Sequence, residues 1–196
     1  MILSNVAIHA AIDEGALVIR PEPTPRLNSL DGPPSPYDTS AVNLRLSPEL
    51  SIADEAKPFV FDLRQKGLAS FLKDAYRAHK MDRDGGFALA PGLFVLGNTV
   101  ETIELPIREN QRCLAARVEG RSSFARCGLL IHFTAPTIHA GFSGTITFEM
   151  MNLGKQSIML FPNMPICQLI FEAVDGTPLR NDSQFHGQKT PAGTTA

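Results

Sequence analysis

The residues best suited to chemistry are concentrated in one short segment, GRSSFARCG, residues 120–128, between two apolar stretches. Arg121 and Arg126 each carry a planar guanidinium with several N–H donors, and Ser122 and Ser123 add hydroxyl groups. Together with backbone N–H groups of a turn, these donors could hold a phosphate chain. A solvated β-turn with two surface arginines is the alternative, and no phosphate-loop spacing decides between the two interpretations.

A single carboxylate, Glu149, stands in the apolar segment GTITFEMMN, residues 144–152. If this side chain faces an enclosed site, burial raises its pKa toward neutrality and suits it to take a proton from water and return it to a leaving group. If it faces solvent, it is a charge on a strand surface without a role. Alternation along a strand does not choose between the two faces.

The histidines and cysteines form no recognisable metal-ligand pattern. His132 and His139 lie seven residues apart with no third ligand at a suitable offset, and Cys113, Cys127 and Cys167 form no CxxC pair. The HxE and PCxxC signature of zinc deaminases is absent. We therefore expect no zinc, cysteines that act as small buried hydrophobes, histidines with structural hydrogen bonds, and a reducing cytoplasm as the location.

Composition excludes several other classes of protein. The 196 residues include 18 basic and 20 acidic side chains, a formal net charge of −2, without the basic excess of a dedicated nucleic-acid binder. No stretch of 18 apolar residues predicts a membrane span, and no basic region precedes the apolar N-terminus. With 43% hydrophobic and 19% charged residues, we expect one soluble globular domain, residues 1–196, that binds neither nucleic acid nor membranes.

The elements that position these groups are mainly short strands. Glycine and proline, 15 of each, recur at short intervals along the chain and bound the apolar segments. The segments that we expect to form strands are residues 16–20, 40–47, 87–92, 93–99, 113–118, 128–135, 144–152, 157–161 and 166–173. This order predicts a mostly antiparallel β fold.

Two helices and two irregular segments complete the prediction. Ser4 is suited to cap a helix that ends at Gly15, and apolar spacing predicts a second helix over residues 68–79. Residues 21–39 hold six prolines and predict a long surface loop that joins no sheet. From about residue 181 the chain reads as a flexible tail with no apolar residues to pack on its own subunit.

At GRSSFARCGLLIHFTAPTIHAGFSGTITFEMMNLG, residues 120–154, the sequence closely resembles the deoxycytidine triphosphate deaminases, relatives of the trimeric deoxyuridine triphosphatases. The resemblance extends upstream through SAVNLRLS and FALAPGLFVLGNTVETIELP, and downstream through FPNMPICQLIFE to FHGQKTP. It implies a dUTPase-like β-clip fold, a distorted jelly-roll-like barrel. It also implies a homotrimer with active sites between subunits, Mg²⁺ carried in by the substrate triphosphate, and no zinc.

The resemblance also implies roles for the polar residues singled out above. Glu149 stands at the position of the family's catalytic glutamate and would act as the proton shuttle. Arg126 and Ser122 would help to fix the attacking water and the base. Arg121, Ser122 and Ser123 would hold phosphates.

Further substrate contacts follow from the same resemblance. Thr134 and Ala135 would present backbone groups to the cytosine edge, and Thr137 belongs to the same binding segment. His139 would contact the sugar, and Gln188 in the tail would close over the triphosphate.

Four positions depart from the family's pattern. His139 and Asn43 each stand where family members have an aspartate, Gln184 stands where some have a lysine, and Phe185 replaces a tyrosine. The first aspartate contacts the sugar and, in bifunctional relatives, orients the water that attacks the α-phosphate. Histidine can still bond a hydroxyl, so we expect altered sugar recognition, lower phosphate affinity and no diphosphate release.

The implied activity is hydrolytic deamination of dCTP to dUTP and ammonia, with Glu149 as general base and no metal at the base. One alternative is a dUTP or dCTP pyrophosphatase or a bifunctional deaminase-diphosphatase. Another is a catalytically silent, nucleotide-binding regulatory trimer. Feedback inhibition by dTTP, acting through His132, is a further expectation from the resemblance.

Overall fold

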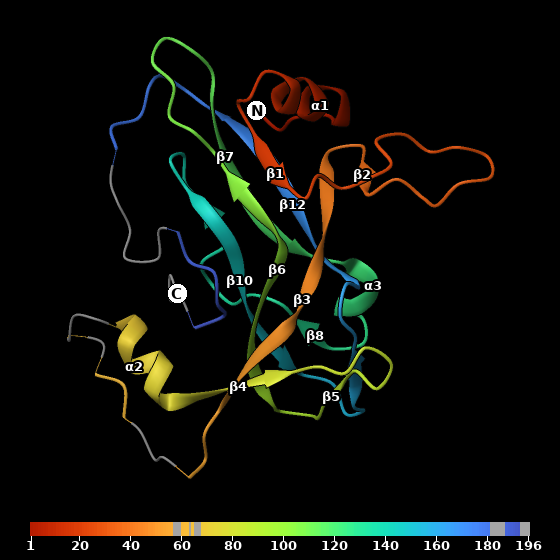
Figure 1. Ribbon diagram of the computed structural model, residues 1–196, viewed down its shortest axis with the longest axis vertical. Helices are drawn as coiled ribbons and strands as arrows, with labels where there is room; N and C mark the ends of the chain where they lie inside the picture. Colours follow the sequence, from red (N-terminus) through yellow and green to blue (C-terminus); the bar gives the residue numbers. More distant parts are fainter. Residues whose placement is uncertain (57–59, 63, 65–67, 181–186, 193–196) are drawn as a thin grey trace.

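One curled antiparallel sheet dominates the computed structural model, which describes residues 1–56, 60–62, 64, 68–180 and 187–192 (Figure 1). Its main path runs β8-β10-β6-β3-β12-β7-β9, with β1 paired to β6 and both β2 and β4 paired to β3. Its strands are β1 (Val18–Arg20), β2 (Tyr37–Asp38), β3 (Ala41–Ala53), β4 (Tyr76–Lys80), β6 (Phe94–Glu104), β7 (Cys113–Gly120), β8 (Leu129–Leu130), β9 (Thr137–Ile138), β10 (Ser143–Asn152) and β12 (Pro165–Val174). A separate pair joins β5 (Phe87–Leu89) to β11 (Ile158–Leu160), and the mainly β prediction is confirmed.

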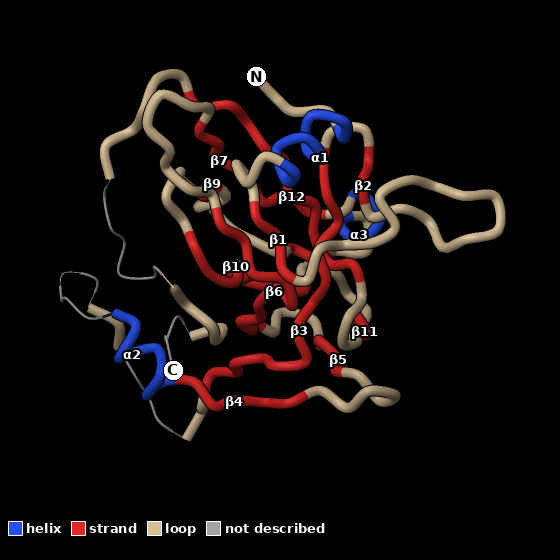
Figure 2. The backbone as a smooth tube through the Cα atoms, turned by 45° about the horizontal axis from the view of Figure 1, so that its top comes forward, coloured by secondary structure: helices blue, strands red, loops and turns tan. Residues whose placement is uncertain are grey.

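Strand β3 joins two halves of this sheet, one formed with β12 and the other with β6. Its residues 42–45 pair with β12, whereas Leu46 and residues 50–52 pair with β6. The register shifts between Leu46 and Leu50, and Pro48, which has no N–H to donate to a ladder, lies inside that shift. The irregularity lets one strand serve both halves, and Figure 2 shows β3 passing through the centre of the molecule.

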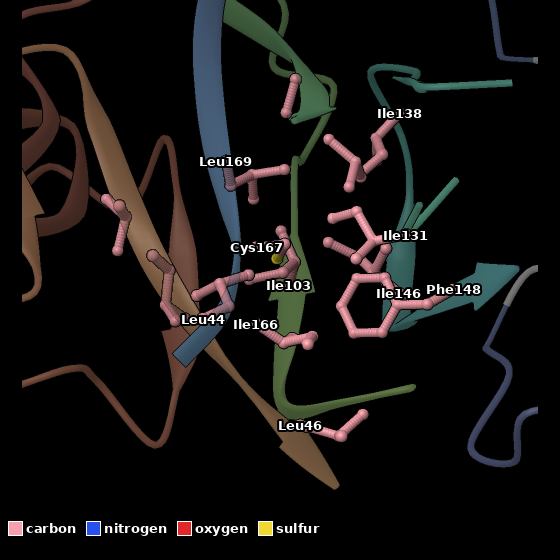
Figure 3. Close-up of a cluster of buried hydrophobic side chains, with 14 of the residues drawn as sticks. Leu44, Leu46, Ile103, Ile131, Ile138, Ile146, Phe148, Ile166, Cys167 and Leu169 are labelled. Atoms are coloured by element: carbon pink, nitrogen blue, oxygen red, sulfur yellow. The ribbon is translucent and has the colours of Figure 1, made fainter. Parts of the chain in front are cut away.

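The hydrophobic core lies inside the curl of the sheet. Figure 3 shows Leu44 from β3, Ile103 from β6, and Ile146 and Phe148 from β10 pointing toward one another. On β10, Phe148 is fully buried, and the period of two therefore turns Glu149 to the opposite face of the strand. The core thus fixes the direction of the candidate base.

The first helix, α1 (Asn5–Asp13), has the predicted boundaries. The Ser4 hydroxyl accepts a hydrogen bond from the Ala7 N–H at 3.3 Å, and Gly15 follows the helix with a φ of 69°. Only a residue tolerant of the left-handed region ends a helix in this way without strain, so the capping prediction is confirmed.

The second helix is shorter than its apolar spacing predicts. Helix α2 (Leu68–Ala75) stops where the backbone enters β4, which pairs with β3 from Ala53↔Tyr76 to Glu49↔Lys80. Residues 76–79 were therefore wrongly assigned to the helix, because ladder hydrogen bonds to β3 override the local helical pattern.

Other boundaries also differ from the prediction. Tyr37 and Asp38, placed in the proline-rich loop, form β2 against β3, and residues 21–36 form no strand. Of residues 128–135, only Leu129 and Leu130 form a strand, so His132 lies in a loop. Residues 120–128, expected to form a loop or turn, hold a short third helix, α3 (Ser122–Ala125), whose Phe124 packs against the core.

Candidate active site

A cavity of about 960 Å³ lies beside β10. Residues from β4, β6, β7, β9, β12, α2, the loops on either side of β9 and the C-terminal segment also line it. It falls within the range of about 300–1,000 Å³ that is usual for small-molecule sites. Five predicted site residues line it together: Ala135, Thr137, His139, Glu149 and Gln188. The structure therefore gathers half of the predicted site in one hollow.

Most of the remaining wall is apolar. Phe94, Leu96, Phe142 and Ile146 face the cavity from β6 and from the start of β10 and the loop before it. Such a wall suits a flat heteroaromatic ring, whose faces need no hydrogen-bond partners, while the few polar groups fix its edges.

Glu149 is the carboxylate of this cavity, and its side chain is half-buried. Burial raises the pKa of Glu149 above its ordinary value of 4.5, whereas hydrogen bonds from the backbone N–H groups of Glu149 and Phe133 and the charge of His132 act in the opposite direction. Burial dominates, so the group binds a proton more readily than an exposed glutamate. That property suits proton transfer at neutral pH.

His132 lines the same cavity, although sequence reasoning expected a structural histidine. Its Nδ1 atom is buried and has no hydrogen-bond partner among the described residues. A buried polar atom without a partner in a cavity wall is available to a bound molecule. The sequence gives only a weak indication that His132 is a site residue, because only the family resemblance connected it with a ligand.

The predicted phosphate segment lies elsewhere. Arg121 lines a second cavity of about 430 Å³, together with Asn43, Arg45 and Glu101. Arg121 Nη1 donates a hydrogen bond to Asn43 Oδ1 at 2.9 Å, and its guanidinium carbon lies 5.5 Å from the centre of the Phe124 ring. The structure thus separates the arginine from the carboxylate.

Four other predicted residues line neither of these two cavities. Ser122, Ser123 and Arg126 on and beside α3 are exposed, and so is Thr134 in the loop before β9. Within one chain, the structure does not bring them to Glu149.

The C-terminal segment packs on its own subunit, which corrects the prediction for residues 187–192. Gln188 is buried, its Nε2 donates to the Thr145 carbonyl at 2.9 Å, and the Thr145 N–H donates to the Gln188 carbonyl at 3.1 Å. Gly144 permits this approach, because a Cβ there would lie 3.0 Å from the Gln188 oxygen. Pro191 and Ala192 supply the apolar contact that the composition did not suggest. Gln184 and Phe185 lie outside the described residues.

The cysteines follow the prediction in part. Cys113 and Cys167 are buried, and burial raises the pKa of the Cys167 thiol. Cys127 is exposed just beyond α3, so its assignment to the buried hydrophobes was wrong: the turn that follows α3 leads the side chain outward.

Among the described residues, no group of three or more histidine, cysteine, aspartate or glutamate side chains is gathered that could hold a metal ion. None of the described helices combines the length and hydrophobicity that a membrane crossing requires.

Comparison with known proteins identifies the relatives of this chain. Residues 2–174 match the family model described as dCTP deaminase-like. The "dCTP deaminase, dUMP-forming" of Dictyoglomus thermophilum is 34% identical over 197 residues, covering 97% of this chain and 92% of that protein. The protein of the same name from Coprothermobacter proteolyticus is 36% identical over 198 residues, covering 99% and 95%. The "dCTP deaminase" of Natronomonas pharaonis is 33% identical, covering 97% and 92%.

A solved structure supports the fold. The 2'-deoxycytidine 5'-triphosphate deaminase from Agrobacterium tumefaciens superposes with a TM-score of 0.62 at 16% identity, over 88% of this chain. This chain spans about half the length of that protein, 48% of its chain. The likeness confirms the mainly β fold of the described residues, which that deaminase shares. With the family match across residues 2–174 and identities of 33–36% over nearly the whole length, the chain belongs to the dCTP deaminase family.

Proposed function

We propose that this enzyme deaminates dCTP by hydrolysis, with Glu149 as the general base. The observation that carries the proposal is the position of Glu149: a carboxylate with a raised pKa in the wall of a largely apolar cavity. Such a group accepts a proton more readily than an exposed glutamate and can release it again within one reaction cycle.

The reaction consumes one water molecule. Its oxygen bonds to C4 of the cytosine ring while Glu149 takes a proton and passes it to the ring nitrogen N3. The bond between C4 and the exocyclic nitrogen then breaks, and ammonia leaves with the second proton from the water, relayed by the same carboxylate. Positioning and the exclusion of bulk water supply the acceleration, and the apolar wall of Phe94, Leu96 and Ile146 serves the second purpose.

The product that we propose is dUTP. His139 lies in the same cavity as Glu149, at the position where the resemblance implies an aspartate that orients the water for attack on the α-phosphate. An imidazole is a poorer group for that task than a carboxylate, because it carries no negative charge to orient the water. The second candidate is a bifunctional reaction to dUMP and diphosphate, which the names of the Dictyoglomus and Coprothermobacter relatives favour.

The enzyme works as a homotrimer with shared sites in this proposal. Glu149 and Arg121 line different cavities of one chain, and Arg126 is exposed beside neither. If all three act on one nucleotide, a second copy must bring its α3 segment to the Glu149 cavity. Mg²⁺ then arrives with the triphosphate, and the arginines help it to neutralise the negative charge of the phosphates.

A silent regulatory trimer is less well supported. A protein that only senses nucleotide needs no carboxylate with a raised pKa in its cavity, and such a group costs folding free energy. Inhibition by dTTP through His132, which lines the cavity, stays a prediction.

One assay tests the proposal. Purified protein is incubated with dCTP and Mg²⁺, and ammonia and diphosphate are measured separately. Ammonia release with no diphosphate is expected. Diphosphate released at a comparable rate would establish the bifunctional reaction, and the absence of both products would refute the enzyme function. Metal analysis of the nucleotide-free protein is expected to find no stoichiometric zinc, and zinc would contradict the metal-free mechanism.

A further inference from the structure

The two arginines in the wall of the smaller cavity differ in their partners. Arg45 Nε lies 2.6 Å from Oε1 of Glu101, a fully buried carboxylate. Arg121 Nη1 instead donates a hydrogen bond to the neutral Asn43 Oδ1 at 2.9 Å, and within the described ranges no carboxylate forms an ion pair with it. The charge of Arg45 is therefore neutralised in place, whereas that of Arg121 is not.

The amide of Asn43 has only one possible orientation. Its Nδ2 donates to the Pro36 carbonyl and to Asp38 Oδ2, both at 3.0 Å. Gln168 Nε2 donates to the same Asp38 oxygen at 2.7 Å, and Asn43 and Gln168 are direct partners across β3 and β12. Because both amide hydrogens are occupied, the amide oxygen must face Arg121.

This arrangement places a neutral group between a cation and a carboxylate. Asp38 lies next to Asn43 on the side away from Arg121, and its negative charge is held there by two amides. An aspartate at position 43 would leave the Pro36 carbonyl without its side-chain donor and set two carboxylates side by side. It would also pair with Arg121 and compete with any anion for that charge.

We propose that Asn43 is a positioning residue that fixes the Arg121 guanidinium with an uncharged acceptor, so that its full charge is available to the substrate triphosphate. The proposal rests on the proposed function only in taking that triphosphate as the ligand. The proposal also gives a physical reason for asparagine at position 43, whereas the expectation of lower phosphate affinity gives none.

The experiment measures dCTP binding by calorimetry with full-length protein carrying Glu149→Gln, which prevents turnover. In that background, Asn43→Asp is expected to weaken dCTP binding by about tenfold, the size of one lost hydrogen bond to a charged group. The dependence of binding on salt should also become less steep, because one cation is neutralised before the anion arrives. Asn43→Ala should weaken binding less and keep the original salt dependence.

Two further variants separate this role from a general effect on the fold. Gln111→Glu makes the same chemical change on an exposed loop beyond the other end of β7 and should leave dCTP binding and its salt dependence unchanged. Arg121→Ala should weaken binding by itself, and adding Asn43→Asp to it should weaken binding no further, because Asn43 acts through Arg121. If Asn43→Asp does not fold, the same cycle is run with Asn43→Ala.

Additive losses in the double variant, or unchanged binding in Asn43→Asp, would overturn the proposal. The same preparations with Glu149 intact are assayed for ammonia. If ammonia is released but the losses of dCTP binding in Asn43→Asp and Arg121→Ala add in the double variant, only the role of Asn43 is refuted. If the losses do not add and no ammonia is released, only the deaminase function is refuted. Absence of dCTP binding to the parent protein refutes both.

Discussion

His132 stands beside Glu149 in one cavity and opposes the effect of burial on its pKa. Burial favours the protonated carboxyl, and a positive imidazole favours the carboxylate. Burial raises the pKa of Glu149, and the backbone hydrogen bonds from Glu149 and Phe133, together with the charge of His132, act against it; these effects together set the pH at which the candidate base becomes available.

Replacing Glu149 by glutamine tests the assignment of the base. Glutamine keeps the volume but accepts no proton, so turnover of dCTP should fall by about 10²–10⁴-fold while nucleotide binding persists. Ammonia release and calorimetry measure the two effects. Glu49→Gln, the same change at an exposed position of β3, serves as the control and should turn over normally. Near-normal turnover of Glu149→Gln would refute the mechanism.

The pH profile tests the electrostatics. Since the base must be deprotonated to take a proton from water and its pKa is raised, the acid limb of kcat/KM should lie above 4.5, the ordinary value for glutamate. His132→Asn removes a positive charge that lowers the pKa of Glu149, so its acid limb should move to higher pH. Steady-state rates from pH 4 upward supply the measurement. An acid limb that stays in place in His132→Asn would show that the imidazole does not act on the base.

His139→Asp tests the product. This change restores a carboxylate to the cavity of Glu149, where it can orient a water molecule toward the α-phosphate. The ratio of diphosphate to ammonia released from dCTP should therefore rise above that of the parent protein. His79→Asp, at a histidine on β4 outside this cavity, is the matched control and should leave the ratio unchanged. An unaltered ratio in His139→Asp would remove that residue from the explanation of the product.

Assembly is tested by mixing two inactive proteins. Glu149→Gln and Arg126→Ala are expected to be inactive alone, and mixed trimers should recover part of the activity if each site takes these residues from different chains. Light scattering should give the mass of three copies. If mixing restores nothing, the two residues belong to one chain; a monomer at the assay concentration would refute the trimer altogether.

Sequence reasoning predicted the fold more completely than the site. Apolar segments bounded by glycine, proline or asparagine identified β10 and β12, and the Ser4 cap and Gly15 gave α1 its ends, because these signals are local. Tyr76 was misplaced in a helix because its partner Ala53 lies more than twenty residues earlier in the chain, and no local pattern reports such a pairing.

In the site, the resemblance chose the correct face for Glu149, which alternation could not. The separation of Arg121 from Glu149 was not predictable, since a motif gives the order of residues and not the cavity that each one faces. The buried, unpartnered Nδ1 of His132 likewise becomes visible only when the surrounding loop is folded.

The register shift around Pro48 has a consequence for how the protein unfolds. Asn43 and its contact to Arg121 lie before that shift, and the part of β3 after it pairs with Leu96 in the wall of the Glu149 cavity. Local unfolding of β3 would disturb both cavities, because the same strand carries Asn43 in the smaller cavity and pairs with β6 in the wall of the Glu149 cavity. The amide hydrogens along β3 should therefore exchange with solvent in a single cooperative opening, and the two cavities should melt as one unit.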